Sequence, residues 1–212
     1  MTLRTAVFAS GGGSNFQALL DHESPSASWR IVLLITDRVD AGAIERARAA
    51  GLPVAVVAGA GREPAEVAQE LLEVLAEHRV DLILLAGYLK LVPGNVVARY
   101  RQRILNIHPA LLPKFGGKGM YGIRVHRAVL EAGEPESGAT VHFVDEEYDR
   151  GALVAQQRVP GHETDTPEEL AARVLAVEHQ LYPAAVEHVC TAIAAGAEPK
   201  LMTVQSTREG LQ

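Results

Sequence analysis

Two polar residues of this chain, Asn106 and His108, are spaced to act together on one reacting group. They stand at the end of an apolar run in the segment 103–113, Arg-Ile-Leu-Asn-Ile-His-Pro-Ala-Leu-Leu-Pro. Side chains two positions apart in a strand point to the same face, and Pro109 ends the strand. An amide N–H and a protonated imidazole aimed at one point suit the oxyanion that develops at an attacked carbonyl. A strand end whose polar groups are satisfied locally explains the pair equally well.

A carboxylate that could complete this pair comes later in the chain. The segment from Gly138 to Gly151 is rich in polar residues and places Asp149 in a turn. A nearby carboxylate favours the charged form of an imidazole and can assist proton transfer. We therefore predict that Asn106, His108 and Asp149 are the catalytic residues and that Asp149 raises the pKa of His108.

A glycine turn near the start of the chain, Ser10-Gly-Gly-Gly-Ser-Asn15, has the composition of a phosphate-binding loop. Glycines let backbone N–H groups approach an anion, and the helix that follows adds a partial positive charge. The alternative is that Ser14 and Asn15 only cap that helix. A nicotinamide dinucleotide is disfavoured, because Phe16 stands where the Rossmann fingerprint has its third glycine.

These segments together resemble those of the phosphoribosylglycinamide formyltransferases, folate-dependent enzymes that use 10-formyltetrahydrofolate. The resemblance covers nearly the whole chain and rests on the segments 9–15, 85–92, 105–109, 149–151 and 177–183. It implies transfer of a formyl group from 10-formyltetrahydrofolate to the amine of glycinamide ribonucleotide in de novo purine biosynthesis. The products would be formylglycinamide ribonucleotide and tetrahydrofolate.

The Asn-x-His-Pro pattern with a downstream Asp is shared by formyl-transferring and formyl-hydrolysing relatives, so it leaves alternatives. The principal one is a formyltetrahydrofolate hydrolase that uses water at the same site. A methionyl-tRNA formyltransferase is disfavoured by the length and acidic charge of the chain. A non-catalytic nucleotide-binding module is disfavoured because the three catalytic residue types are all present.

The resemblance also implies binding roles for particular residues. Those implied to hold the ribonucleotide are Gly13, Ser14 and Asn15 at its phosphate and Glu178 at its ribose hydroxyls. Those implied to contact the folate are Arg62, Leu89, Lys90, Leu91, Val92 and Asn106. The residue pattern alone leaves a solvated surface position open for Arg62 and Glu178, and a loop folded over the core open for 89–92.

Length, composition and charge limit the class of protein. The 212 residues, 48% hydrophobic and 22% charged, are typical of one soluble globular domain. The net charge of −6 argues against nucleic-acid partners, and the lack of a run of 18 apolar residues argues against a membrane span. We expect small-molecule substrates and a monomer or homodimer.

A single cysteine, Cys190, and an N-terminus without signal-peptide character favour the cytoplasm. His108 and His142 lack zinc-type spacing, so no metal is expected.

The order of apolar patterns predicts the elements that position these residues. It indicates one α/β domain over 1–212, Rossmann-like, with a mostly parallel sheet, helices on both faces and some antiparallel pairing among the later strands. The N-terminal part is expected to bind the phosphate and ribonucleotide, and the C-terminal part the folate. The expected strands are 3–9, 30–35, 53–57, 80–86, the segment with Asn106 and His108, 140–144 and 152–159. The expected helices are 16–21, 40–50, 64–79, one from 93, 126–132 and a long one opened by a capping box at 166–169. Four glycines within 114–124 predict a mobile cover over the site.

Overall fold

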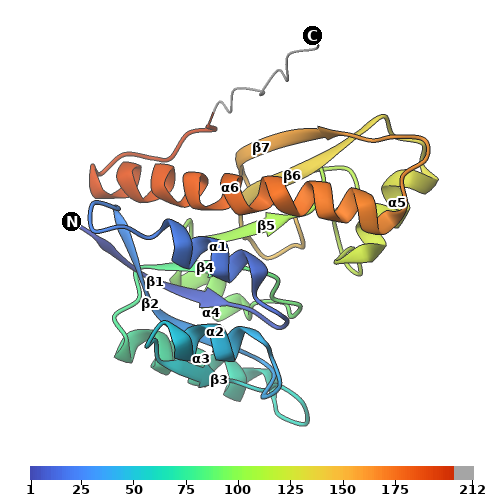
Figure 1. Cartoon of the computed structure of the whole chain (residues 1–212). Helices are drawn as coiled ribbons and strands as arrows, with labels where there is room; N and C mark the ends of the chain where they lie inside the picture. Colours follow the sequence, from blue (N-terminus) through green and yellow to red (C-terminus); the bar gives the residue numbers. More distant parts are fainter. Residues whose placement is uncertain (203–212) are drawn as a thin grey trace.

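A sheet of seven strands runs through the molecule in the order β3-β2-β1-β4-β5-β6-β7 (Figure 1). This computed structural model describes residues 1–202 of the chain. The strands are β1 (Leu3–Phe8), β2 (Trp29–Thr36), β3 (Val54–Val56), β4 (Leu82–Leu85), β5 (Ile104–His108), β6 (Glu136–Phe143) and β7 (Leu153–Pro160). The helices of the described residues are α1 (Ser14–His22), α2 (Ala43–Ala49), α3 (Pro64–Glu77), α4 (Gly94–Arg99), α5 (Ile123–Glu131) and α6 (Pro167–Ala194).

The direction of strand pairing changes at β5. Strands β3, β2, β1, β4 and β5 pair in parallel, whereas β6 is antiparallel to β5 and β7 is antiparallel to β6. This confirms the predicted mostly parallel sheet with antiparallel pairing among the later strands. In the register, Leu85 at the end of β4 pairs with Asn106, and Asn106 pairs with His142 of β6. The carboxyl ends of β4 and β5 therefore lie together, where open parallel sheets bind their ligands.

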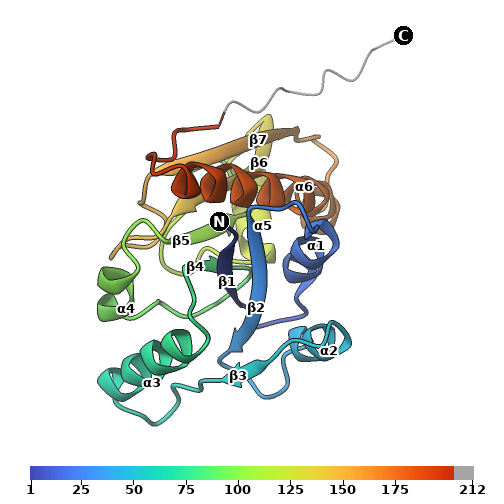
Figure 2. The same ribbon diagram turned by 90° about the vertical axis from the view of Figure 1, so that its left-hand side faces the viewer.

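Helices cover both faces of the sheet, as predicted (Figures 1 and 2). Helices α1, α2, α5 and α6 contribute to the hydrophobic core on one face, and α3 and α4 to the core on the other. Strand β4 is buried at all four positions, which is why its sequence is an unbroken apolar run. The long α6 packs on α1, β6 and β7 and so joins the early and late parts of the chain.

The helix boundaries differ from the prediction in ways that have local causes. Helix α1 begins at Ser14, because Gly13 takes the N-cap position in a left-handed conformation and its carbonyl accepts the first helical bond from Gln17. The interpretation of Ser14 and Asn15 as caps is therefore wrong. Helix α5 begins at Ile123, three residues before the predicted start, directly after Gly122.

Helix α6 begins where the sequence predicts. Thr166 and Glu169 form the predicted capping box, with Pro167 in the first turn. Pro183 lies inside α6 and does not end it. Among the helices of residues 1–202, none combines the length and apolar character needed to cross a membrane.

Candidate active site

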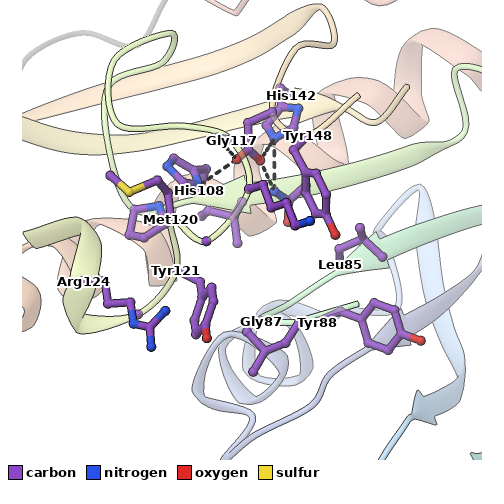
Figure 3. Close-up of a pocket in the computed structure, with 18 of the residues that line it drawn as sticks. Leu85, Gly87, Tyr88, His108, Gly117, Met120, Tyr121, Arg124, His142 and Tyr148 are labelled. Carbon is purple, nitrogen blue, oxygen red and sulfur yellow. Dashed lines mark hydrogen bonds and ion pairs between the residues drawn. The ribbon is translucent and has the colours of Figure 1, made fainter. Parts of the chain in front are cut away.

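A cavity of about 570 Å³ opens at the carboxyl ends of β4 and β5 (Figure 3). Its floor comes from these two strands, and one wall from the loop 87–92. The other walls are the glycine-rich segment 117–124, the turn 147–149 and one face of α6. The cavity therefore draws on both the parallel and the antiparallel part of the sheet.

Asn106 and His108 lie on the same face of β5, and both line the cavity. The Asn106 side-chain nitrogen, Nδ2, lies 3.5 Å from Oδ1 of Asp149 and donates over 3.0 Å to Nε2 of His142. Nε2–H of His108 donates to the carbonyl oxygen of Phe115 over 2.8 Å. On the other side of its ring, Nδ1 of His108 lies 3.7 Å from Oδ2 of Asp149. The three residues predicted as catalytic are thus neighbours in space.

Asp149 holds this group together from a turn with an unusual backbone conformation. Its φ of 56° lies in the left-handed region, and its Oδ2 accepts a hydrogen bond from the N–H of Gly117 over 2.8 Å. A Cβ at Gly116 would lie 2.6 Å from Leu112 and 3.1 Å from Asp149. Glycine at 116 therefore lets the glycine-rich segment approach the carboxylate closely.

Burial and neighbouring charges set the protonation of this group. Burial lowers the pKa of His108 and outweighs the opposing attraction of Asp149. The prediction of a raised His108 pKa is therefore wrong in its net direction, because desolvation of the imidazolium exceeds the gain from the carboxylate. For Asp149, burial opposes ionisation, but the contacts with His142, His108 and the Gly117 N–H together lower its pKa. The arrangement favours a neutral imidazole beside a carboxylate.

His142 belongs to the same group, although its sequence pattern suggested only a metal site that its spacing disfavours. It is 2% exposed and lines the cavity. Its Nδ1–H donates to the carbonyl of Phe143, so its Nε2 is free to accept the bond from Asn106. The same Nε2 lies 3.5 Å from Oδ1 of Asp149. The signal that could have found His142 is its position on β6, directly opposite Asn106.

A second polar pair, Asn15 and Glu178, lies in the same cavity. Nδ2 of Asn15 donates to Oε2 of Glu178 over 2.6 Å, which joins the first turn of α1 to α6. Glu178 is only 6% exposed, so the solvated surface position left open for it is wrong. Burial raises the pKa of Glu178 to about 7, and the bond from Asn15 opposes this effect in part. Gly13 and Ser14 precede Asn15 on the same loop and lie outside the cavity lining.

The residues assigned to the folate fall into two places. Leu89, Lys90, Leu91 and Val92 line the cavity, and Leu89 and Leu91 are each 48% exposed. These two leucines are not folded into the core, whereas Val92 is 3% exposed and packs in the core on the α3 and α4 face. Arg62 lies before α3, where it bonds to Glu70 and to a backbone carbonyl, and it is not part of the cavity lining.

Further cavity residues carry polar or charged groups that the sequence analysis did not assign. His126 on α5 is 4% exposed, and burial, with a smaller effect from His108, lowers its pKa to about 4. Tyr121 and Arg124 lie in the wall across from the Asp149 group, with the guanidinium 5.0 Å from the ring centre (Figure 3). Within residues 1–202, no three His, Cys, Asp or Glu side chains are grouped so that they could hold a metal ion.

Comparison with known proteins gives one consistent family. The family model described as Formyl transferase matches residues 3–186. The chain is 53% identical to a chloroplastic phosphoribosylglycinamide formyltransferase of Arabidopsis thaliana, over 88% of this chain and 65% of that protein. It is 47% identical to the corresponding protein of Vigna unguiculata, over 88% of this chain and 61% of that protein. The chain thus spans a little under two thirds of the length of these relatives.

Solved structures agree with the sequence comparison. The crystal structure of glycinamide ribonucleotide transformylase 1 from Symbiobacterium toebii matches with a TM-score of 0.83 and 40% identity, over 90% of this chain and 88% of that one. A formyltetrahydrofolate deformylase from Pseudomonas syringae has a TM-score of 0.81 at 21% identity and so shares the fold. The match to the family model over most of the chain shows that this protein belongs to the formyl transferase family.

Proposed function

We propose that this protein transfers the formyl group of 10-formyltetrahydrofolate to the amine of glycinamide ribonucleotide. The observation that carries the proposal is the convergence of Asn106, His108 and Asp149 in one cavity that also holds the Asn15–Glu178 pair. The relatives named phosphoribosylglycinamide formyltransferase support it further. The products are formylglycinamide ribonucleotide and tetrahydrofolate, which places the reaction in de novo purine biosynthesis.

The ribonucleotide takes the side of the cavity formed by α1 and α6. Backbone N–H groups at Gly13, Ser14 and Asn15 hold its phosphate at the start of α1. The buried carboxylate of Glu178 accepts hydrogen bonds from the ribose hydroxyls, and Asn15 keeps that carboxylate in place. The reactive amine then points toward Asn106 at the end of β5.

The folate takes the opposite side, against the loop 87–92. Its flat pterin ring suits the apolar surface of Leu89 and Leu91, and Lys90 and the buried Val92 lie on the same loop. Arg62 lies outside the cavity lining, so we assign it to the anionic glutamate tail, which extends away from the reacting centre. The N-terminal part of the chain thus provides most of the ribonucleotide site, and later segments complete the folate site.

The catalytic groups act on the formyl carbon. The neutral amine attacks this carbon, and the carbonyl oxygen becomes an oxyanion that accepts hydrogen bonds from Asn106 and His108. Without substrates, Asn106 faces Asp149 and His142, and His108 donates to Phe115. Binding of the formyl group must therefore redirect these donors. Asp149, directly or through a water, moves the proton from the new ammonium to the folate nitrogen as the carbon–nitrogen bond to the folate breaks.

The test is to incubate the protein with 10-formyltetrahydrofolate and follow release of tetrahydrofolate with and without glycinamide ribonucleotide. Release that requires the ribonucleotide is the expected result. Release of formate in its absence would make water the nucleophile and the protein a hydrolase. No release in either mixture would remove the proposed function. Small molecules are the only partners that this function needs, and the cytoplasmic location and the monomer or homodimer remain predictions.

A further inference from the structure

The carbonyl groups of the glycine loop before α1 are all engaged in hydrogen bonds to α1 or α2. The carbonyl of Gly11 accepts from the N–H of Ala43 over 3.0 Å, and that of Gly12 accepts from Nε of Arg46 over 2.7 Å. The carbonyl of Gly13 accepts from Gln17 within α1. In a trans peptide the C=O and the following N–H point in opposite directions. Fixing these carbonyls therefore turns the N–H groups of Gly12, Gly13 and Ser14 to the other side. Those of Gly13 and Ser14 are two of the three N–H groups proposed to hold the phosphate.

Helix α2 forms the base on which this loop rests. A Cβ added to Gly13 would lie 2.9 Å from Cβ of Ala43 and 3.3 Å from Cδ of Arg46. A Cβ added to Gly42 would lie 3.2 Å from Cα of Gly12. Gly13 also has a φ of 74°, which favours glycine. The close packing means that side chains of α2 can set the conformation of the loop.

Arg46 is the charged side chain of α2 that holds the loop. Besides its bond to Gly12, its Nη1 donates to Oε1 of Gln17 over 3.1 Å, and Gln17 in turn donates to Asp21. The guanidinium is half-buried and linked to both the loop and α1. Arg48, two residues further along α2, is exposed and pairs with Glu45 on the same helix. That is an ordinary surface ion pair, and Arg48 does not contact the loop.

The positive charge of Arg46 also acts on His179 of α6, on the side proposed to bind the ribonucleotide. Burial lowers the pKa of His179, and the positive charge of Arg46 adds to this effect. His179 follows Glu178 directly in the chain. A cation behind a loop whose N–H groups face forward strengthens the attraction for an anion in front of it.

We infer that Arg46 is a positioning residue for the phosphate of the ribonucleotide. It fixes the carbonyl of Gly12, so that the loop presents its N–H groups, and it adds a positive charge behind them. The inference deepens the proposed function and rests on it for the identity of the phosphorylated ligand. A side chain outside the cavity lining thus sets the preference for a phosphorylated substrate.

Binding of ribose 5-phosphate, measured by titration calorimetry, tests this inference without any turnover. We expect Arg46→Met to weaken binding on the order of 10- to 100-fold, the range for loss of a hydrogen bond to a charged group. Arg46→Lys keeps the charge and should fall between the two. Arg48→Met on the same helix should bind like the wild type. Equal affinity of the wild type and both Arg46 variants would overturn the inference.

Kinetics with two acceptors separate positioning from a general structural role. With glycinamide ribonucleotide, Arg46→Met should raise KM for the ribonucleotide and leave kcat and the folate KM unchanged. With the ribonucleoside that lacks the phosphate, the variant and the wild type should react alike. Equal losses on both acceptors would assign Arg46 to the fold alone. If Arg46→Met unfolds, the same two acceptors are compared with Arg46→Lys.

The two proposals can fail separately. If the wild type releases no tetrahydrofolate with glycinamide ribonucleotide, the proposed function fails. A weaker binding of ribose 5-phosphate by the Arg46 variants would still establish the role of Arg46 in phosphate binding.

Discussion

At the scale of single residues, Asn106 is the group whose contacts bear most directly on the reaction. Its side-chain nitrogen faces both Asp149 and Nε2 of His142, so both amide protons have acceptors within the protein. A formyl oxygen that enters the cavity competes for one of them. The protein thereby keeps a half-buried donor satisfied and can release it to an oxyanion, whose negative charge makes the stronger bond.

Replacement of Asn106 by alanine should remove this donor with little effect on the fold. We expect turnover to fall on the order of 100- to 1000-fold, as for loss of one oxyanion donor. KM for either substrate should change little, because the bond strengthens only in the transition state. Steady-state kinetics give both values, and the unfolding midpoint checks the fold. A variant with near-normal turnover would contradict the assignment.

Glu178, the residue proposed to bind the ribose, lowers the free energy of unfolding. Its pKa in the folded protein is raised to about 7, above the ordinary value of 4.5. As pH rises from 4.5 to 7, the unfolded chain releases this proton while the folded protein retains it, so the folded state loses stability. The loss is complete above pH 7 and amounts to on the order of 3 kcal/mol.

Glu178→Gln should therefore be more stable than the wild type at pH 8, and the two should converge at pH 4.5. Urea unfolding at the two pH values measures the difference. Glu168→Gln, at an exposed position of the same helix, serves as the control and should change stability little at either pH. An equal effect of Glu178→Gln at both pH values would show that the cost does not come from ionisation.

The sequence could identify residues whose type and spacing are distinctive, such as Asn106, His108 and Asp149. It could not identify His142 or Arg46, because their roles depend on contacts between distant segments. His142 lies directly opposite Asn106 on the neighbouring strand, and the residue pattern of one strand does not show which residue of the next strand pairs with it. In the sequence, Arg46 is indistinguishable from other arginines on a helix surface, and only the structure shows its bond to Gly12. The direction of the His108 pKa shift likewise depends on how deeply the imidazole is buried.

At the scale of elements, α6 connects the site to the core through residues one turn apart. Glu178 and Tyr182 are four positions apart and so lie on the same face of the helix. Tyr182 is fully buried, and its hydroxyl lies 3.0 Å from the carbonyl of Leu85 and 3.1 Å from that of Leu105. Leu85 pairs with Asn106 in the sheet. One helix thus fixes both the carboxylate proposed to bind the ribose and the strand ends that carry the proposed catalytic amide.

Tyr182→Phe should affect both stability and catalysis. Loss of the buried hydrogen bond should cost about 1–2 kcal/mol in unfolding free energy. A small displacement of the β5 end should lower kcat on the order of tenfold, because reacting groups tolerate little misplacement. Tyr100→Phe is the matched control, since its hydroxyl bonds to Val80 on the other face of the sheet. That variant should lose stability alone, and equal kcat values for the two variants would contradict the link.

Element boundaries were predictable where the signal is chemical and local. The capping box at Thr166 and Glu169 fixes the start of α6 by side-chain bonds that the sequence shows directly. The start of α1 was missed because Gly13 adopts a left-handed conformation that depends on packing against α2. Helix α5 also begins directly after a glycine with a positive φ, Gly122, at a place where no cap residue signals the start.

At the scale of the whole molecule, the cavity lies where the two kinds of strand pairing meet. The parallel part supplies Asn15 and the loop 87–92, and the antiparallel part supplies His142 and the turn of Asp149. The alternation of strand and helix patterns predicted this division of the sheet. It could not predict the cavity volume or which side chains line it, because these depend on how α5 and the segment 117–124 pack over β5.

The proposed function places the two substrates against both parts of the sheet, so each should stabilise the whole fold when it binds. A ligand present at 100 times its Kd adds about 2.7 kcal/mol to the unfolding free energy. For a domain of this size that corresponds to a rise in Tm of roughly 5–10 °C. We expect glycinamide ribonucleotide and a non-hydrolysable folate analogue each to raise Tm, and the pair to raise it further. Differential scanning fluorimetry at increasing ligand concentration measures the effect. Protection by the folate analogue alone would favour a hydrolase, since water as nucleophile needs no ribonucleotide site and Glu178 would then have no hydroxyl to bind.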